Sequence, residues 1–225
     1  MSETRPAPLQ HHFRDLEQQK EAATLGMWVF IAQEIMFFGG LFGAYAVYRA
    51  MHYNAFADGS LHLDWKVGAA NTLVLLASSL TMALGVHAAQ LGKRKAVVWW
   101  LLATIALGSV FLGVKVFEYR EKFAHHLVPG PGFHYEPRAE ENLTADPNLA
   151  RNAQTFFTLY FGMTGLHAFH MIVGIPILLW MAARAWRGHF GPDYHSPVEI
   201  AGLYWHFVDI IWIFLFPLLY LVGHH

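Results

Sequence analysis

Five side chains that can hold or exchange a proton fall inside long apolar stretches of this sequence. They are Glu34, His167, His170, His206 and Asp209. An ionisable group at the centre of a membrane span costs at least about 2.5 to 3.5 kcal/mol, so such groups usually face protein or water and serve a purpose. The chemistry open to them is proton transfer, internal hydrogen bonding or ligation by imidazole.

The depth and spacing of these residues suggest that they belong together. The apolar stretches are centred near residues 36, 168 and 210, which places all five side chains within roughly 5 Å of the membrane midplane. His167 and His170 are one helical turn apart, as are His206 and Asp209, so each pair can share a helix face. We therefore expect a buried polar seam of these five residues where the first, fourth and fifth spans meet.

Two interpretations of this seam stay open. In the first, the groups satisfy one another and fix the register of the helices. In the second, the carboxyl of Glu34 is kept protonated by desolvation and relays or buffers protons. A haem b held by paired imidazoles is a further alternative, but Asp209 and the one-turn spacing favour a hydrogen-bonded network. We predict no catalytic residue and no metal ligand on this chain.

The elements that must position these residues are membrane-spanning helices. Hydrophobic residues make up 55% of the 225 residues and charged residues only 14%, which is wrong for a soluble domain. Five segments reach the length of about 20 apolar residues that a spanning helix needs, and lipid-exposed sheet edges are not viable. We predict one all-α domain over 1–225, an integral membrane bundle of five transmembrane helices, at about 25–48, 67–91, 97–117, 154–183 and 198–222.

The polar segments complete this description. Residues 1–22 form a polar tail, and no cleaved signal peptide is expected. Residues 118–151 form a long extramembrane loop that contains several Pro and Gly residues. Arg184, Trp186 and Arg187 follow the fourth span, where such side chains anchor a helix at the interface and can hold phospholipid phosphates. Lys93, Arg94 and Lys95 crowd the shortest loop and favour a cytoplasmic N-terminus and a periplasmic C-terminus.

Composition excludes several classes of protein. The sequence contains no Cys, which excludes disulfides, iron-sulfur clusters and copper sites built on Cys. The formal net charge of -1 excludes a broadly basic nucleic-acid binder. A transporter would need a substrate path, and the spans show neither repeated halves nor paired broken helices.

Several short motifs of the sequence resemble those of cytochrome c oxidase subunit III. The most specific are GMWVFIAQEIMFF at 26–38 and YWHFVDIIW at 204–212, which resemble the family's third helix and one of its last two helices. Shorter matches lie at 71–79, 117–119 and 165–170. Together they cover the five spans in order. The family's longer members begin with two further helices, so this sequence resembles the short five-helix bacterial form.

The resemblance implies a noncatalytic accessory subunit of a proton-pumping haem-copper terminal oxidase, which reduces oxygen to water in aerobic respiration. It implies an obligate hetero-oligomer in the bacterial plasma (inner) membrane, in contact with oxidase subunits I and II, which carry the haems and coppers. No cofactor is expected on this chain itself, although phospholipid is, near the matching Arg184. Glu34, His167 and His170 match polar positions inside the family's helices.

The sequence leaves the partner complex open. Related subunits belong to quinol oxidases and nitric oxide reductases. The motifs that all of them share do not identify the electron donor. An autonomous haem b quinol oxidoreductase is the alternative from a different class. A stoichiometric haem Soret band from the separately purified chain would support it.

Overall fold

The computed structural model describes residues 9–138, 147–192 and 194–223 as a bundle of helices. The helices are α1 (Leu16–Met51), α2 (Tyr53–Leu61), α3 (Trp65–Gln90), α4 (Arg94–Ala124), α6 (Leu149–Trp186) and α7 (Ser196–Tyr220). All of these except α2 are long and apolar enough to cross a membrane. The prediction of an all-α protein with five transmembrane helices is confirmed.

The helices extend past the hydrocarbon limits that hydropathy suggests. α1 begins at Leu16 rather than near residue 25, because Asp15 caps it by accepting a 2.8 Å hydrogen bond from the backbone of Gln18. α4 continues to Ala124 and α6 begins at Leu149, so both ends of the predicted 118–151 loop are helical instead. Residues 139–146 of that connection lie outside the described residues.

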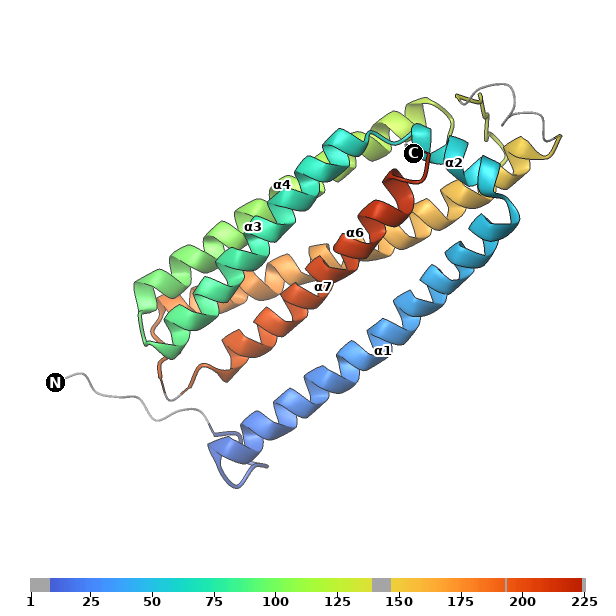
Figure 1. The fold of residues 1–225 in the computed structure, drawn as a ribbon. Helices are drawn as coiled ribbons and strands as arrows, with labels where there is room; N and C mark the ends of the chain where they lie inside the picture. The colour runs from blue at the N-terminus through green and yellow to red at the C-terminus, as the bar shows by residue number, and fades with distance from the viewer. Residues whose placement is uncertain (1–8, 139–146, 193, 224–225) are drawn as a thin grey trace.

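One helix was not expected at all. α2 occupies nine residues of the connection between the first two spans, and six of them are buried. The segment contains Asp58, Gly59 and Ser60, which are poor residues for a helix interior. Packing at one end of the bundle therefore overrides local propensity here, and α2 lies beside the end of α6 (Figure 1).

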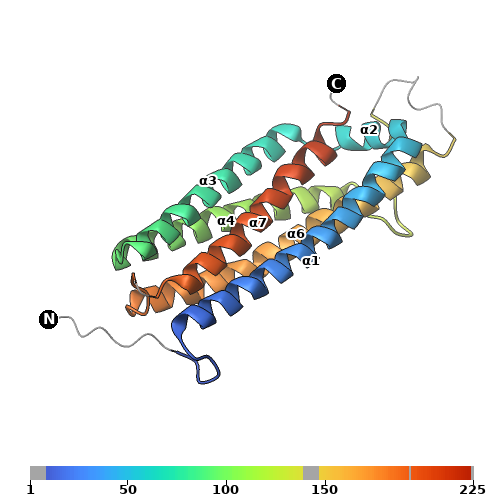
Figure 2. The ribbon, with the colours of Figure 1, turned by 60° about the horizontal axis from the view of Figure 1, so that its bottom comes forward.

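The core lies around α7, which contacts α1, α2, α3 and α6. Trp205 and Trp212 are its largest fully buried side chains. A Cβ atom at Gly108 of α4 would come within 2.9 Å of the ring of Trp205, and one at Gly174 of α6 within 3.0 Å. These glycines let two helices approach the indole closely. α1 runs along the outside of the bundle, against α6 and α7, and is the least buried of the five spans (Figures 1 and 2).

Candidate functional site

Glu34 and His170 meet at membrane depth and join α1 to α6. Glu34 Oε2 lies 3.4 Å from His170 Nε2, and both residues are buried. The other ring nitrogen of His170 lies 2.9 Å from the carbonyl oxygen of Leu166 on its own helix. Tyr204 of α7 donates a 2.8 Å hydrogen bond to the backbone carbonyl of His170. The contact between Glu34 and His170 brings two groups that can each hold a proton together across the α1–α6 interface, although Glu34 Oε2 has no hydrogen bond of ordinary geometry among the described residues.

His167 does not join this pair, although it is one turn away on α6. Its side chain is fully buried against the rings of Phe111 and Trp212, whose centroids lie 5.4 and 5.1 Å from its own. Neither ring nitrogen has a hydrogen-bond partner among the described residues. His167 thus occupies an aromatic site between α4 and α7, away from Glu34.

The polar neighbour of His206 and Asp209 comes from α3, not from α1 or α6. His206 Nδ1 lies 2.7 Å from Ser79 Oγ of α3. The carboxyl of Asp209 is buried, and within the described part of the chain it makes no hydrogen bond of ordinary geometry, although Ser79 lies nearby. The five residues therefore do not form the one seam that their depth suggests. The structure places them in three separate environments, because α3, which the predicted seam did not include, supplies the polar neighbour of His206 and Asp209.

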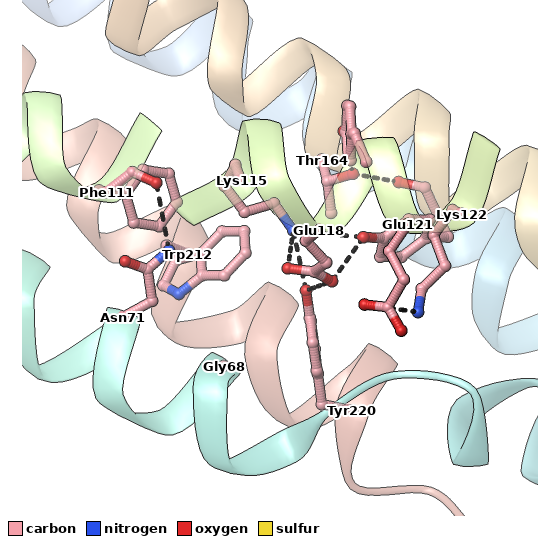
Figure 3. A network of polar contacts seen from close by, with 12 residues as sticks. Gly68, Asn71, Phe111, Lys115, Glu118, Glu121, Lys122, Thr164, Trp212 and Tyr220 are labelled. Atoms are coloured by element: carbon pink, nitrogen blue, oxygen red, sulfur yellow. Dashed lines mark hydrogen bonds and ion pairs between the residues drawn. The ribbon is translucent and has the colours of Figure 1, made fainter. Parts of the chain in front are cut away.

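A buried ion-pair cluster, not expected from the sequence, joins α4, α6 and α7 (Figure 3). Lys115 Nζ donates to Glu118 Oε2 at 3.0 Å and to the hydroxyl of Tyr220 at 2.8 Å. The hydroxyls of Tyr220 and Tyr160 donate to Glu118 Oε1 at 2.5 and 2.7 Å. The ammonium also lies 5.0 Å from the ring centroid of Trp212. Each charge of this pair is compensated and hydrogen-bonded, so removing either partner would leave the other buried and uncompensated.

One sequence signal could have revealed this ion-pair cluster. Lys115 and Glu118 are opposite charges three residues apart near the end of an apolar run, a spacing that places them on one helix face. The tyrosines that complete the cluster lie 42 and 102 residues from Glu118 in the sequence, so periodicity alone could not connect them.

A second cluster of hydrogen bonds, also not expected from the sequence, holds α2 and the connection after α4 at the end of the bundle. The carboxyl of buried Asp58 accepts hydrogen bonds from the hydroxyl of Tyr135 and, at 2.8 Å, from the backbone of Arg138. Burial, and then the neighbouring Asp58, raise the pKa of Tyr135, so its hydroxyl stays a donor. Lys122 Nζ donates to the carbonyl oxygen of His62 at 2.6 Å.

The basic residues at the C-terminal end of α6 differ in their exposure. The guanidinium of half-buried Arg184 stacks 4.8 Å from the ring centroid of Trp180, one turn back on the same helix. Its Nε atom is buried without a hydrogen-bond partner in the described ranges. Trp186 and Arg187 are exposed. Across residues 9–138, 147–192 and 194–223, no three His, Cys, Asp or Glu side chains group so as to hold a metal ion.

Comparison with known proteins agrees with this architecture. The sequence profile of the family described as cytochrome c oxidase subunit III matches residues 11–125 and 145–224. Cytochrome c oxidase subunit 3 of Thermostichus vulcanus is 35% identical over 199 residues, which cover 88% of this chain and 86% of that protein. The subunit 3 of Corynebacterium diphtheriae is 31% identical over 201 residues, 88% of this chain and 87% of the other.

A relative with a different name is nearly as similar. Quinol oxidase subunit 3 of Bacillus subtilis is 29% identical over 214 residues, which cover 92% of each chain. The profile match includes every transmembrane helix described above, and both clusters that contain Glu34 and Glu118 fall within it. The chain is thus a multi-pass membrane protein that belongs to the cytochrome c oxidase subunit III family, the third subunits of haem-copper oxidases that use cytochrome c or quinol.

Proposed function

We propose that this chain is a noncatalytic accessory subunit that binds subunit I of the oxidase laterally, holds phospholipid and supports proton uptake and lasting turnover. The observation that carries the proposal is the contact of Glu34 with His170, 3.4 Å apart at the middle of the membrane. With one proton between them, a carboxyl and an imidazole form a pair of zero net charge, so the proton can pass from one group to the other without leaving an unpaired charge in the hydrocarbon. The haems and coppers reside in subunits I and II.

The lipid part of the proposal is supported by the end of α6. The guanidinium of Arg184 stacks on the indole of Trp180, and its terminal N–H groups can still donate to a phosphate. Trp186 and Arg187 lie exposed beside it, at the level where aromatic and basic side chains meet headgroups. We expect Arg184→Ala to lower the phospholipid retained by the purified complex, measured by mass spectrometry of extracted lipid. Arg120→Ala is the matched control, since Arg120 is an exposed arginine of α4 that does not belong to this site.

The proposal is tested on the whole oxidase, purified from cells with and without this chain. The complex that lacks the chain should start at a normal rate of oxygen consumption and then lose activity over many turnovers, with slower proton uptake. An unchanged activity over the same number of turnovers would defeat the accessory role. Cytochrome c and quinol, offered separately to the intact complex, identify the electron donor.

A further inference from the structure

A groove of about 480 Å³ runs between α1 and α7, on the membrane-facing side of their contact. Its floor is formed by Ile31 and Phe38 of α1 and by Phe207 and Ile211 of α7, which are all buried. Its rim includes Trp28 and Phe214, which are more than half exposed. Pockets that bind small molecules have volumes of about 300 to 1,000 Å³, so the groove is large enough for a ligand.

Among the described residues that line this groove, His206 is the only one with a titratable side chain. Its ring is oriented by the contact of Nδ1 with Ser79 Oγ at 2.7 Å. Nε2 has no hydrogen bond to another described residue, so it is the ring nitrogen available to a ligand. Whichever tautomer is present, Nε2 can either donate or accept one hydrogen bond.

The depth of His206 limits the kind of ligand. His206 lies two residues from Val208, the midpoint of α7, which is about 3 Å along the helix axis. The polar group of a phospholipid stays at the interface, and its acyl chain has nothing to offer an imidazole at this depth. A ligand that pairs with His206 must therefore carry an oxygen or nitrogen atom into the hydrocarbon.

The walls of the groove suit a flat ring. The ring centroids of Phe38 and Phe207 lie 6.4 Å apart, as do those of Phe42 and Phe214. Between these aromatic pairs, Gly39 leaves the α1 wall open, because a Cβ atom there would meet nothing within 4 Å. Aromatic side chains hold a ring by stacking or edge contacts, and the apolar rim can take a hydrocarbon tail.

We infer that the α1–α7 groove binds a lipid-soluble ring compound of the quinone or quinol type, with a ring oxygen hydrogen-bonded to His206 Nε2. The apolar tail lies along the rim of the groove between Trp28 and Phe214. The inference concerns binding alone, and it goes beyond the accessory role because that role needs no ligand at this site.

The test is photolabelling of the intact oxidase in phospholipid nanodiscs with an azido-quinone, followed by peptide mass spectrometry. The label should fall on α1 and α7 near His206, and an excess of unmodified quinone should displace it. Gly39→Phe should lower the labelling at least tenfold by filling the groove. Gly40→Phe is the matched control, since Gly40 is equally open but does not line the groove, and it should leave labelling unchanged.

His206→Leu separates the hydrogen bond from the shape of the groove. This variant keeps an apolar side chain of similar length, so labelling should fall about tenfold if the imidazole holds the ring oxygen. Labelling that survives His206→Leu but is lost in Gly39→Phe would overturn the hydrogen bond to His206 and leave an apolar groove that does not recognise a ring oxygen. Labelling that is equal in all variants, or that excess quinone does not displace, would overturn the site itself.

Discussion

Glu34 is the residue on which the functional proposal depends, and its protonation can be read chemically. Its carboxyl is buried against one imidazole, whereas Glu121 and Glu136 have side chains that are 58% and 86% exposed. A membrane-soluble carbodiimide reacts with a protonated carboxyl in an apolar setting. We predict that it labels Glu34 in preference to those two acids, as measured by peptide mass spectrometry.

Two variants make this prediction specific. Glu34→Gln should remove the label. Glu121→Gln should leave it in place, because Glu121 is exposed and separate from the Glu34 site. Equal labelling of the exposed acids would contradict a neutral, selectively reactive Glu34.

The Lys115–Glu118 pair allows a prediction about stability. Lys115→Met leaves the carboxylate of Glu118 buried without its counter-charge, and Glu118→Gln does the reverse to Lys115. Each single variant should cost about 3 to 5 kcal/mol of folding free energy, while the double variant should recover most of it. The measurement is a double-mutant cycle on thermal unfolding of the detergent-solubilised complex. Losses that simply add would show that the two charges do not stabilise each other.

At the scale of elements, α2 acts as an anchor for the connection that follows α4. Asp58→Ala removes the acceptor of both Tyr135 and Arg138, and hydrogen bonds to a charged group contribute about 1.5 to 3 kcal/mol each. We predict that limited proteolysis within residues 131–138 becomes at least about tenfold faster, since about 1.4 kcal/mol changes an opening equilibrium tenfold.

Two further variants grade this effect. Tyr135→Phe removes one of the two bonds and should give an intermediate rate of cleavage. His134→Gln changes an exposed neighbour in the same segment and should leave the rate unchanged. Should Asp58→Ala be cleaved at the parental rate, the connection would be held by other contacts, such as the packing of Phe133 against Phe157.

Elements set by local pattern could be predicted from the sequence, and those set by distant contacts could not. The five spans follow from apolar length, because hydrocarbon requires it. α2 escaped notice because nine residues that include Gly59 are too few for a periodic signal. The depth of each site residue follows from its position along its helix. Its partners depend on the rotation of each helix about its own axis, which the sequence does not determine. Glu34 contacts His170 of α6, whereas His206 contacts Ser79 of α3.

At the scale of the whole molecule, the structure bears on which side of the membrane the N-terminus lies. With the N-terminus inside, the inner segments carry eight basic residues and the outer segments seven, a narrow difference. Lys115 is one of the seven, yet it is 3% exposed and bonded to Glu118 within α4. Lys115 therefore does not belong to an outer loop, and the outer segments then carry six basic residues. This larger difference favours a cytoplasmic N-terminus more strongly, as does the short loop with Lys93, Arg94 and Lys95.

Single-cysteine labelling turns this bias into a prediction, because the sequence has no Cys to remove first. Glu17, at the start of α1, and His134, in the connection after α4, are both exposed and lie on opposite sides of the predicted membrane. On intact cells, an impermeant maleimide should label His134→Cys at once and Glu17→Cys only after the membrane is opened. The parent chain should take no label in either case. The opposite pattern would place the N-terminus outside, and it would put Arg184 and its proposed phospholipid in the outer leaflet.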